Sequence, residues 1–262
     1  MIAIFAAMDV EVQPFLRPAS RGESSEVEGF PVTLASYGSL AAVICRTGIG
    51  RVAKEATESV LDRFPASAVL SVGTAGGVHP DLGPGRLVLC DRVSVSSASG
   101  YNDEDGVVLG DAELIEAARA ALAACGVVAT VAGSLTVDRV VTSVEEKARL
   151  REEFGHQIVE MESYWTGKAA ADRGIPFLAV RVVSDAAGDE VVLTEIGRAD
   201  GTVDYSRLAE WARQNPDRMN VIAQMAERIA AGVGGLEVVA RALVDSMELR
   251  EALAGAQARN RL

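Results

Sequence analysis

Short runs of apolar, often β-branched residues alternate along this chain with alanine-rich stretches that have helical spacing. The clearest run is FLAVRVV, residues 177–183, and a continuous apolar run of this length is typical of a strand buried on both faces. Strands that alternate with helices favour a mostly parallel sheet with helices on its faces. We therefore predict an α/β fold with a mixed central β-sheet flanked by helices, formed as a single domain over residues 1–262.

The same patterns predict the individual elements. Strands are expected at residues 2–6, 31–36, 41–46, 68–72, 86–93, 127–136 and 177–183. Helices are expected at residues 52–64, 112–124, 144–154, 163–173, 205–214, 216–231 and 236–254. Two polar stretches, 18–28 and 94–106, have the composition of surface loops. From about residue 204 we expect a helical C-terminal extension that packs on the sheet or on a partner subunit.

The chain is strongly acidic, with a formal net charge of −12 over 262 residues. Such a surface has no long-range attraction for nucleic acid or for an anionic membrane, which favours a small-molecule ligand. The N-terminal segment MIAIFAAMDVEVQPF lacks a basic region, so we expect neither a signal peptide nor a membrane span. Three cysteines stand singly within apolar runs, which is typical of buried free thiols in a cytoplasmic protein.

Neither a metal nor a cofactor is predicted. The two histidines, His79 and His156, are too few and too isolated to suggest a metal site. GIGRVA, residues 48–53, fits the glycine pattern of a dinucleotide-binding turn. However, the following strand ends in SVG, residues 71–73, without the carboxylate that would hold a ribose. The glycines of GIGRVA are then explained by close packing in a tight turn.

Two other turns carry polar groups at the ends of predicted strands. VGTAGGV, residues 72–78, places glycine amides and the Thr74 hydroxyl where open α/β sheets bind ligands, although it could be a flexible connection. Ser184 and Asp185 end the run at 177–183. A partly desolvated carboxyl there can act as a general acid. The alternative is that Asp185 caps a following helix.

Three further acids have both a functional and a structural interpretation. Glu11 lies one turn into the helix expected after the first strand and, taken alone, is a solvated surface acid. Glu160 and Glu162 flank Met161 in the segment VEMESYW. A carboxylate can accept hydrogen bonds from both hydroxyls of a sugar, and a methionine can cover the apolar face of the sugar. Alternatively, the two acids begin a helix, where the helix dipole favours negative charge.

Five segments together resemble the nucleoside phosphorylase/nucleosidase superfamily in order and spacing. They are AMDVEV (7–12), TGIGRVAKEAT (47–57), SVGTAGGV (71–78), VEMES (159–163) and IPFLAVRVVSDAAGD (175–189). The branch that they resemble most is that of the 5′-methylthioadenosine/S-adenosylhomocysteine nucleosidases. The resemblance implies a nucleoside phosphorylase-like three-layer sandwich that cleaves the N-glycosidic bond of a purine nucleoside without a metal.

The resemblance also implies a role for each matching residue. Asp185 matches the acid that protonates the purine as the bond breaks, and Ser184 matches the neighbour that positions it. Glu11 matches the base that activates water. Glu162 matches the carboxylate that binds the ribose hydroxyls, and Met161 matches the methionine packed on the sugar. The remaining substrate contacts that it implies are Ile49, Thr74, Ala75, Gly76, Val140 and Val141, with Glu160 as either a supporting contact or a helix-end residue. The family usually has an aromatic residue against the base where this chain has the two valines.

Members of this superfamily use either water or phosphate as the nucleophile. Its phosphorylases share a GDP-x-R turn after the first strand and an arginine ahead of the VGT turn. This chain has AMDVEV and Ser71 at those positions. Carboxylates without the arginines would repel a phosphate dianion, so hydrolysis is favoured. Arg46 and Arg51 remain possible substitutes, which leaves phosphorolysis open.

The C-terminal part, from Glu190 onward, resembles the tail of the hopanoid-associated phosphorylases. A nucleoside with a bulky 5′-substituent therefore remains an alternative substrate. A non-catalytic nucleoside-binding relative is a further alternative, and the retained acids Glu11, Glu162 and Asp185 argue against it. Superfamily members form homo-oligomers, so the resemblance also implies a homodimer or a higher homo-oligomer.

Overall fold

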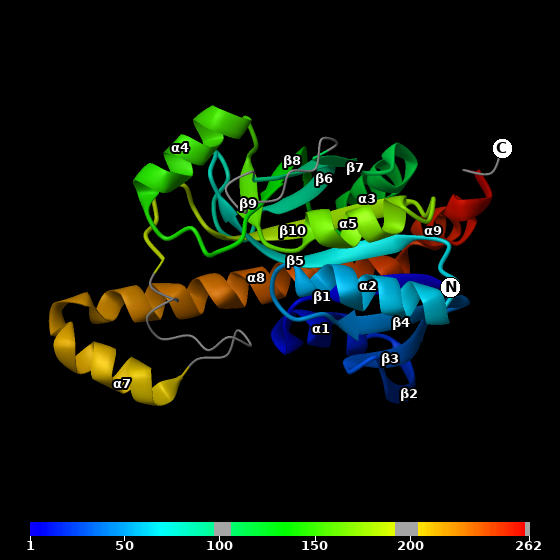
Figure 1. Ribbon diagram of the computed structural model, residues 1–262, viewed down its shortest axis with the longest axis horizontal. Coiled ribbons are helices and arrows are strands. Elements are labelled where there is room, and N and C mark those ends of the chain that lie inside the picture. Colours follow the sequence, from blue (N-terminus) through cyan, green and yellow to red (C-terminus); the bar gives the residue numbers. More distant parts are fainter. Residues whose placement is uncertain (97–105, 192–203, 260–262) are drawn as a thin grey trace.

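The apolar runs form the strands of one mixed sheet, and the alanine-rich stretches form helices on both sides of it (Figure 1). The computed structural model describes residues 1–96, 106–191 and 204–259. Its strands are β1 (Ile2–Ala6), β2 (Ser20–Val27), β3 (Phe30–Tyr37), β4 (Leu40–Arg46), β5 (Val69–Gly77), β6 (Leu87–Val95), β7 (Val107–Leu109), β8 (Thr130–Thr136), β9 (Ile158–Glu160) and β10 (Phe177–Asp185). Its helices are α1 (Asp9–Leu16), α2 (Val52–Arg63), α3 (Ala112–Ala124), α4 (Val144–Phe154), α5 (Ser163–Ala171), α7 (Tyr205–Gln214), α8 (Met219–Asp245) and α9 (Met247–Arg259).

The order of the strands brings four parallel strands together. The sheet runs β10-β6-β8-β9-β5-β1-β4-β3-β2, and β10 also pairs with β5, so that β5, β9, β8, β6 and β10 close into a ring. Strands β4, β1, β5 and β10 lie in parallel, with Ile4 opposite both Ile44 and Leu70, and Leu70 opposite Leu178. The carboxyl ends of parallel strands meet at one edge, where open α/β sheets bind ligands. The turns after these four strands therefore lie together.

Both faces of the sheet are buried. Ile2 and Ile4 belong to the core under α1, α3, α8 and α9, whereas Ala3 and Phe5 belong to the core under α2 and α5. Successive side chains of a strand point to opposite faces, so one apolar run contributes to both cores. The predicted α/β fold with a mixed central sheet flanked by helices is confirmed.

Helix α8 differs from its prediction. The sequence predicts two helices, 216–231 and 236–254, separated at GVGG, but α8 continues without a break to Asp245. Its glycines instead let the helix approach the sheet closely. A Cβ on Gly232 would lie 2.9 Å from Thr74 Cγ2, and a Cβ on Gly235 would lie 2.6 Å from Val182 Cγ1. The C-terminal extension was predicted to pack on the sheet or on a partner subunit, and in the structure α8 packs on β5 and β10.

Strands β2, β7 and β9 were not predicted. Residues 18–28, predicted as a surface loop, contain β2, whose exposed polar side chains conceal its pairing with β3. Strands β7 and β9 are too short to be recognised from their composition, yet β9 pairs with both β5 and β8. The other predicted loop, 94–106, lies mostly outside the described residues. None of the helices in the described ranges has the length and apolarity needed to cross a membrane.

Candidate active site

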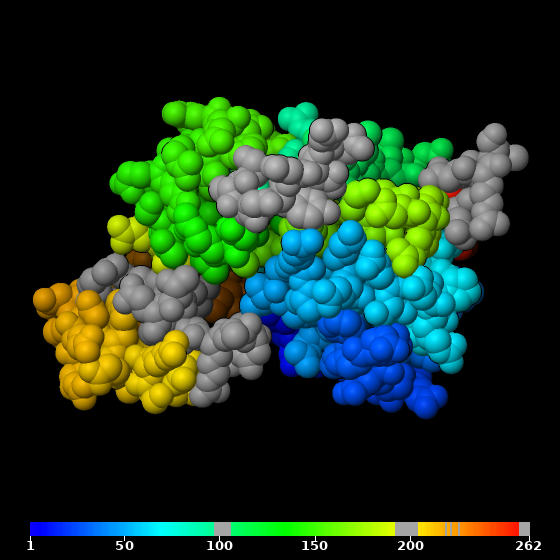
Figure 2. Space-filling model, in the orientation of Figure 1, coloured from blue at the N-terminus to red at the C-terminus, as the bar shows by residue number. Residues whose placement is uncertain are grey.

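The carboxyl edge of the parallel strands brings several of the predicted residues together. Glu11 follows β1, Ile49 follows β4, Thr74 lies near the end of β5, and Asp185 ends β10. Figure 2 shows the molecule hollowed on this side, between the green segment that contains α4 and the blue to cyan segment that leads into α2. Brown atoms of α8 lie at the bottom of this hollow.

Glu11 is buried and bound to β5. Its Oε1 accepts hydrogen bonds from the backbone N–H of Thr74 at 2.8 Å and from Thr74 Oγ1 at 2.9 Å. Only 3% of Glu11 is exposed, so the interpretation of Glu11 as a solvated surface acid is wrong. A Cβ on Gly73 would lie 3.0 Å from this oxygen and 2.7 Å from Arg181 Nη1, so glycine leaves room for both side chains.

Glu160 is held inside the protein by a buried arginine. Its Oε2 accepts hydrogen bonds from Arg181 Nη2 at 2.9 Å and from the backbone N–H groups of Glu162 and Ser163 at 2.9 and 2.6 Å. Its other oxygen accepts a hydrogen bond from the Thr136 hydroxyl. Burial raises the pKa of Glu160, but the positive charge of Arg181 and these hydrogen bonds outweigh burial and hold the pKa below its usual value. Glu160 therefore fixes the backbone that carries Met161 and Glu162.

Glu162 stands at the N-terminal end of α5 and reaches the turn after β4. It makes no capping hydrogen bond, and its Oε1 accepts one from the backbone N–H of Gly50 at 2.8 Å. Met161 lies at the same turn, since its Cε is 4.0 Å from where a Cβ on Gly50 would be. Burial raises the pKa of Glu162 to about 8, and the negative charges of Glu160 and Glu11 add to this effect. Burial and these two charges therefore favour the protonated form of Glu162 to a higher pH than in an ordinary glutamate.

The pH dependence of stability provides a test of this raised pKa. Because the pKa of Glu162 is about 8 in the folded protein, against 4.5 for an unperturbed glutamate, the folded state binds the additional proton between these values. The stabilisation that Glu162 contributes is then fully present below the unfolded-state pKa. It is lost as the pH rises toward the folded-state pKa. Relative to the wild type, Glu162→Gln should gain stability by up to about 1.4 kcal/mol per pH unit across this window. Urea unfolding of both proteins at several pH values measures the difference, and a difference independent of pH would contradict the raised pKa.

Asp185 lies between a hydroxyl and a buried ammonium group. Its Oδ1 accepts a hydrogen bond from Ser184 Oγ at 2.6 Å, and its Oδ2 accepts one from Lys147 Nζ at 2.5 Å. Ser184 Oγ also lies 3.1 Å from the Ala75 carbonyl oxygen, and a Cβ on Gly76 would lie 3.2 Å from Asp185 Oδ2. Residues 186–191 are not helical, so the alternative of a helix cap is wrong.

The sequence reasoning missed Lys147. The residue lies on α4 and shares the buried side of that helix with Leu150, three positions later. A lysine at a core-facing position of an amphipathic helix is the one signal that could have found it. The acid that it meets is distant in sequence, so only the assembled fold reveals the pair.

Three residues predicted to contact the substrate, Val140, Val141 and Ile49, make no described hydrogen bond to Glu11, Glu162 or Asp185. Val141 is 6% exposed and packs with Leu150 in the apolar cluster under α4, whereas Val140 is 37% exposed. Ile49 is half-buried in the turn between β4 and α2. The contacts of these three residues with a base or a sugar remain predictions.

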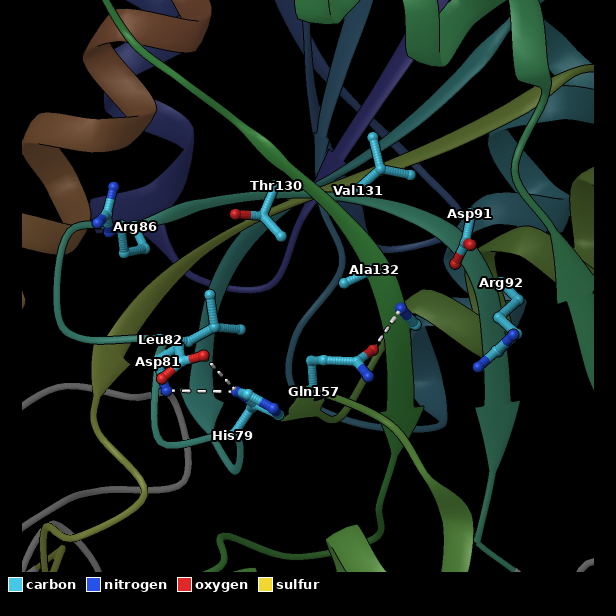
Figure 3. A pocket seen from close by; sticks show the side chains of 11 residues that line it. His79, Asp81, Leu82, Arg86, Asp91, Arg92, Thr130, Val131, Ala132 and Gln157 are labelled. Atoms are coloured by element: carbon cyan, nitrogen blue, oxygen red, sulfur yellow. Dashed lines mark hydrogen bonds and ion pairs between the residues drawn. The ribbon is translucent and has the colours of Figure 1, made fainter.

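A second hollow, of about 490 Å³, lies apart from the predicted residues (Figure 3). Its lining residues are His79, Asp81, Leu82, Arg86, Asp91, Arg92, Thr130, Val131, Ala132, Gly133 and Gln157. The backbone N–H of Asp81 donates to His79 Nδ1, and that of Gly133 donates to Gln157 Oε1. Two arginines and two aspartates line this hollow, so its charges balance and select for neither an anion nor a cation.

Comparisons with known proteins identify the family of this chain. The sequence matches the family model of the phosphorylase superfamily over residues 1–227. A 5′-methylthioadenosine/S-adenosylhomocysteine nucleosidase of Shewanella piezotolerans is 27% identical over 201 residues, which cover 72% of this chain and 87% of that relative. A nucleosidase of the same name from Bacillus thuringiensis is 28% identical over the same shares of the two chains.

Solved structures show the same fold. A 5′-methylthioadenosine/S-adenosylhomocysteine nucleosidase of Neisseria meningitidis, in complex with methylthio-immucillin-A, has a TM-score of 0.74 at 21% identity, over 94% of this chain and 99% of that one. The futalosine hydrolase of Helicobacter pylori has a TM-score of 0.74 at 20% identity, over 93% of this chain and 97% of that one. At these identities the likeness supports the fold alone. The family predicted from the five segments is confirmed by the family match.

Proposed function

The chain belongs to the phosphorylase superfamily, and on that premise we propose that it cleaves the N-glycosidic bond of a purine nucleoside with water as the nucleophile. The observation that carries the proposal is that two consecutive residues of β5 bind Glu11 of α1 and Ser184 of β10, the neighbour of Asp185. Thr74 binds Glu11 from α1, while Ala75 binds Ser184, the partner of Asp185. One acid and one base thus flank a single strand end.

In the proposed reaction Asp185 is the general acid. A purine leaves poorly as an anion and much better once it is protonated. Proton transfer from a positioned side chain typically contributes about 10²–10⁴-fold to the rate. Ser184 holds one oxygen of the carboxyl at 2.6 Å and so orients the acid. The sugar that loses the base acquires positive charge, as in glycoside hydrolysis.

In the proposed reaction Glu162 binds the sugar and Glu11 activates the water. In its ionised form Glu162 offers acceptors to the two hydroxyls of a ribose, and Met161 beside it can cover the apolar face of the ring. Glu11 is buried beside Thr74 and can accept a proton from an attacking water. Carboxylates also stabilise the positive charge that develops on the sugar.

The positions of the nearby arginines favour water over phosphate. Arg181 is buried, and its Nη2 donates to both Glu160 and Ser71. Arg46 pairs with Asp9 at 3.2 Å, and the guanidinium of Arg51 lies 5.3 Å from the centre of the Trp165 ring. Each of these three arginines already has a partner. To bind a phosphate dianion, an arginine would have to give up its present contact with a carboxylate or an aromatic ring.

Phosphate dependence is the direct test of the nucleophile. Adenosine, inosine and nucleosides with 5′-methylthio or larger apolar 5′-groups are incubated with the protein, with and without phosphate, and free base is measured. We expect base release from at least one adenine nucleoside at a rate that phosphate leaves unchanged, with free pentose as the other product. Turnover only in the presence of phosphate, with a pentose 1-phosphate as product, would replace hydrolysis with phosphorolysis. The same panel decides between a small and a bulky 5′-substituent.

We also propose that residues 1–262 form one domain in a cytoplasmic homo-oligomer. Strand β7 supports the oligomer, because it pairs with β6 and leaves Val107 and Leu109 50% and 70% exposed. Apolar side chains at the edge of a sheet favour burial against another chain. Sedimentation equilibrium of the purified protein should give a mass of at least two chains.

A further inference from the structure

Lys147 lies directly behind the acid of the proposed reaction. Its side chain is completely buried, whereas 14% of the Asp185 side chain is exposed. Its Nζ lies 2.5 Å from Asp185 Oδ2, 2.7 Å from the Ala186 carbonyl oxygen and 3.0 Å from the Asp189 carbonyl oxygen. An ammonium group has three protons to donate, and these three acceptors match them.

Burying a lysine side chain is energetically unfavourable if the residue serves only to pack the core. Taking a charge out of water is unfavourable unless it is paired, and an apolar side chain of similar size is often as stabilising as a buried ion pair. Helix α4 already contributes Leu150 to an apolar cluster, so the helix packs without a charge at position 147. Within the described parts of the chain, the only charged side chain bound to Lys147 is Asp185. This placement indicates a role that depends on the acid.

We propose that Lys147 is the positioning residue of the general acid, and that its charge stabilises the carboxylate left behind when Asp185 gives its proton to the purine. This inference rests on the proposed function. In the step, the O–H bond of Asp185 breaks and an N–H bond forms on the base, while the electron pair of the C–N bond stays with the base. Asp185 becomes a carboxylate beside the Lys147 ammonium, and water restores its proton after the base leaves.

The other charges around Asp185 neutralise each other. Asp189 follows in the same loop, and its Oδ1 pairs with Arg228 Nη2 of α8 at 2.8 Å. Its Oδ2 accepts a hydrogen bond from the backbone N–H of Ala186 at 2.8 Å. The neighbouring residues of β5 and β9, Gly76 and Val159, carry no charge. Among the described residues, Lys147 is therefore the cation that pairs with the acid.

The test compares two leaving groups. Purine nucleosides need a proton on the base, whereas 4-nitrophenyl ribofuranoside releases a stable anion and does not. We expect Lys147→Met to lower kcat for the best nucleoside by about 10–100-fold, within the range of general-acid catalysis, and to leave kcat for the nitrophenyl riboside within about twofold. Lys168→Met, which removes the exposed pair with Asp172, is the matched control and should change neither rate.

A double variant separates positioning from stability. If Lys147 acts through Asp185, Lys147→Met should cost nothing further in an Asp185→Asn background. Equal losses on both substrates by a folded Lys147→Met protein, or additive losses in the double variant, would overturn the inference. Lys147→Gln, whose amide can still donate to the carbonyl groups, answers the same question if the methionine variant does not fold. Failure of the proposed function is distinct, because the wild type would then release no base from any nucleoside.

Discussion

Asp185→Asn is expected to lower kcat for base release from a purine nucleoside by about 10²–10⁴-fold. An amide has nearly the same shape as the carboxyl and can still accept from Lys147, but it cannot deliver a proton to the base. Because Asp185 acts on the leaving group, KM should change much less than kcat. Steady-state kinetics on the best nucleoside of the substrate panel measures both constants.

The control for this variant is Asp172→Asn. Asp172 also pairs with a lysine, Lys168 at 2.6 Å, but on the surface of α5. Its replacement should leave base release unchanged. Full activity of a folded Asp185→Asn protein would show that another group protonates the base, and the mechanism proposed for this site would then be wrong.

Glu160→Leu is expected to destabilise the protein by about 3–5 kcal/mol, because it leaves the buried Arg181 without its counter-ion. The two side chains are 1% and 2% exposed, so water cannot replace the lost partner. The further change Arg181→Met should recover most of the loss, since an apolar pair of similar volume is often as stable as a buried ion pair. Urea unfolding of the three proteins gives the free energies.

An exposed pair of the same chemistry is the reference for this experiment. Arg173 Nη2 lies 2.7 Å from Asp62 Oδ1, with side chains 27% and 69% exposed. Replacing Asp62 with leucine should cost less than about 1 kcal/mol, as for other surface pairs. If Glu160→Leu cost no more than this, Arg181 would have an alternative partner inside the protein.

The fold could be predicted where the pattern is local. A strand such as β10 is apolar on both faces and stands out as a continuous run. Nearly every residue of β2 is polar, and the strand forms because it pairs with β3. This pairing cannot be recognised from the sequence of β2 alone. The glycines of α8 look like a break, because the backbone that approaches them belongs to strands far away in the sequence.

The candidate site could be predicted in part for the same reason. Residues at the ends of parallel strands must meet at one edge, so Thr74 and Asp185 could be placed from the sequence. Lys147 could not, because a charged residue is normally expected at the surface. Arg181 lies in the run predicted to be buried, but the partner that it needs there could not be predicted. Their burial depends on partners that only the assembled sheet brings to them, Asp185 for the one and Glu160 for the other.

The ring of strands formed by β5, β9, β8, β6 and β10 has a consequence for folding cooperativity. Asp185 lies on β10, a strand of the ring. Glu11 lies on α1, outside the ring, and is hydrogen-bonded to Thr74 of β5 within it. A nucleoside that contacts both acids can bind only when the ring and the strands beside it are complete. Binding should therefore stabilise the whole protein against unfolding, by an amount that grows with the logarithm of ligand concentration. A thermal-shift screen of nucleosides would then identify substrates before any assay of turnover.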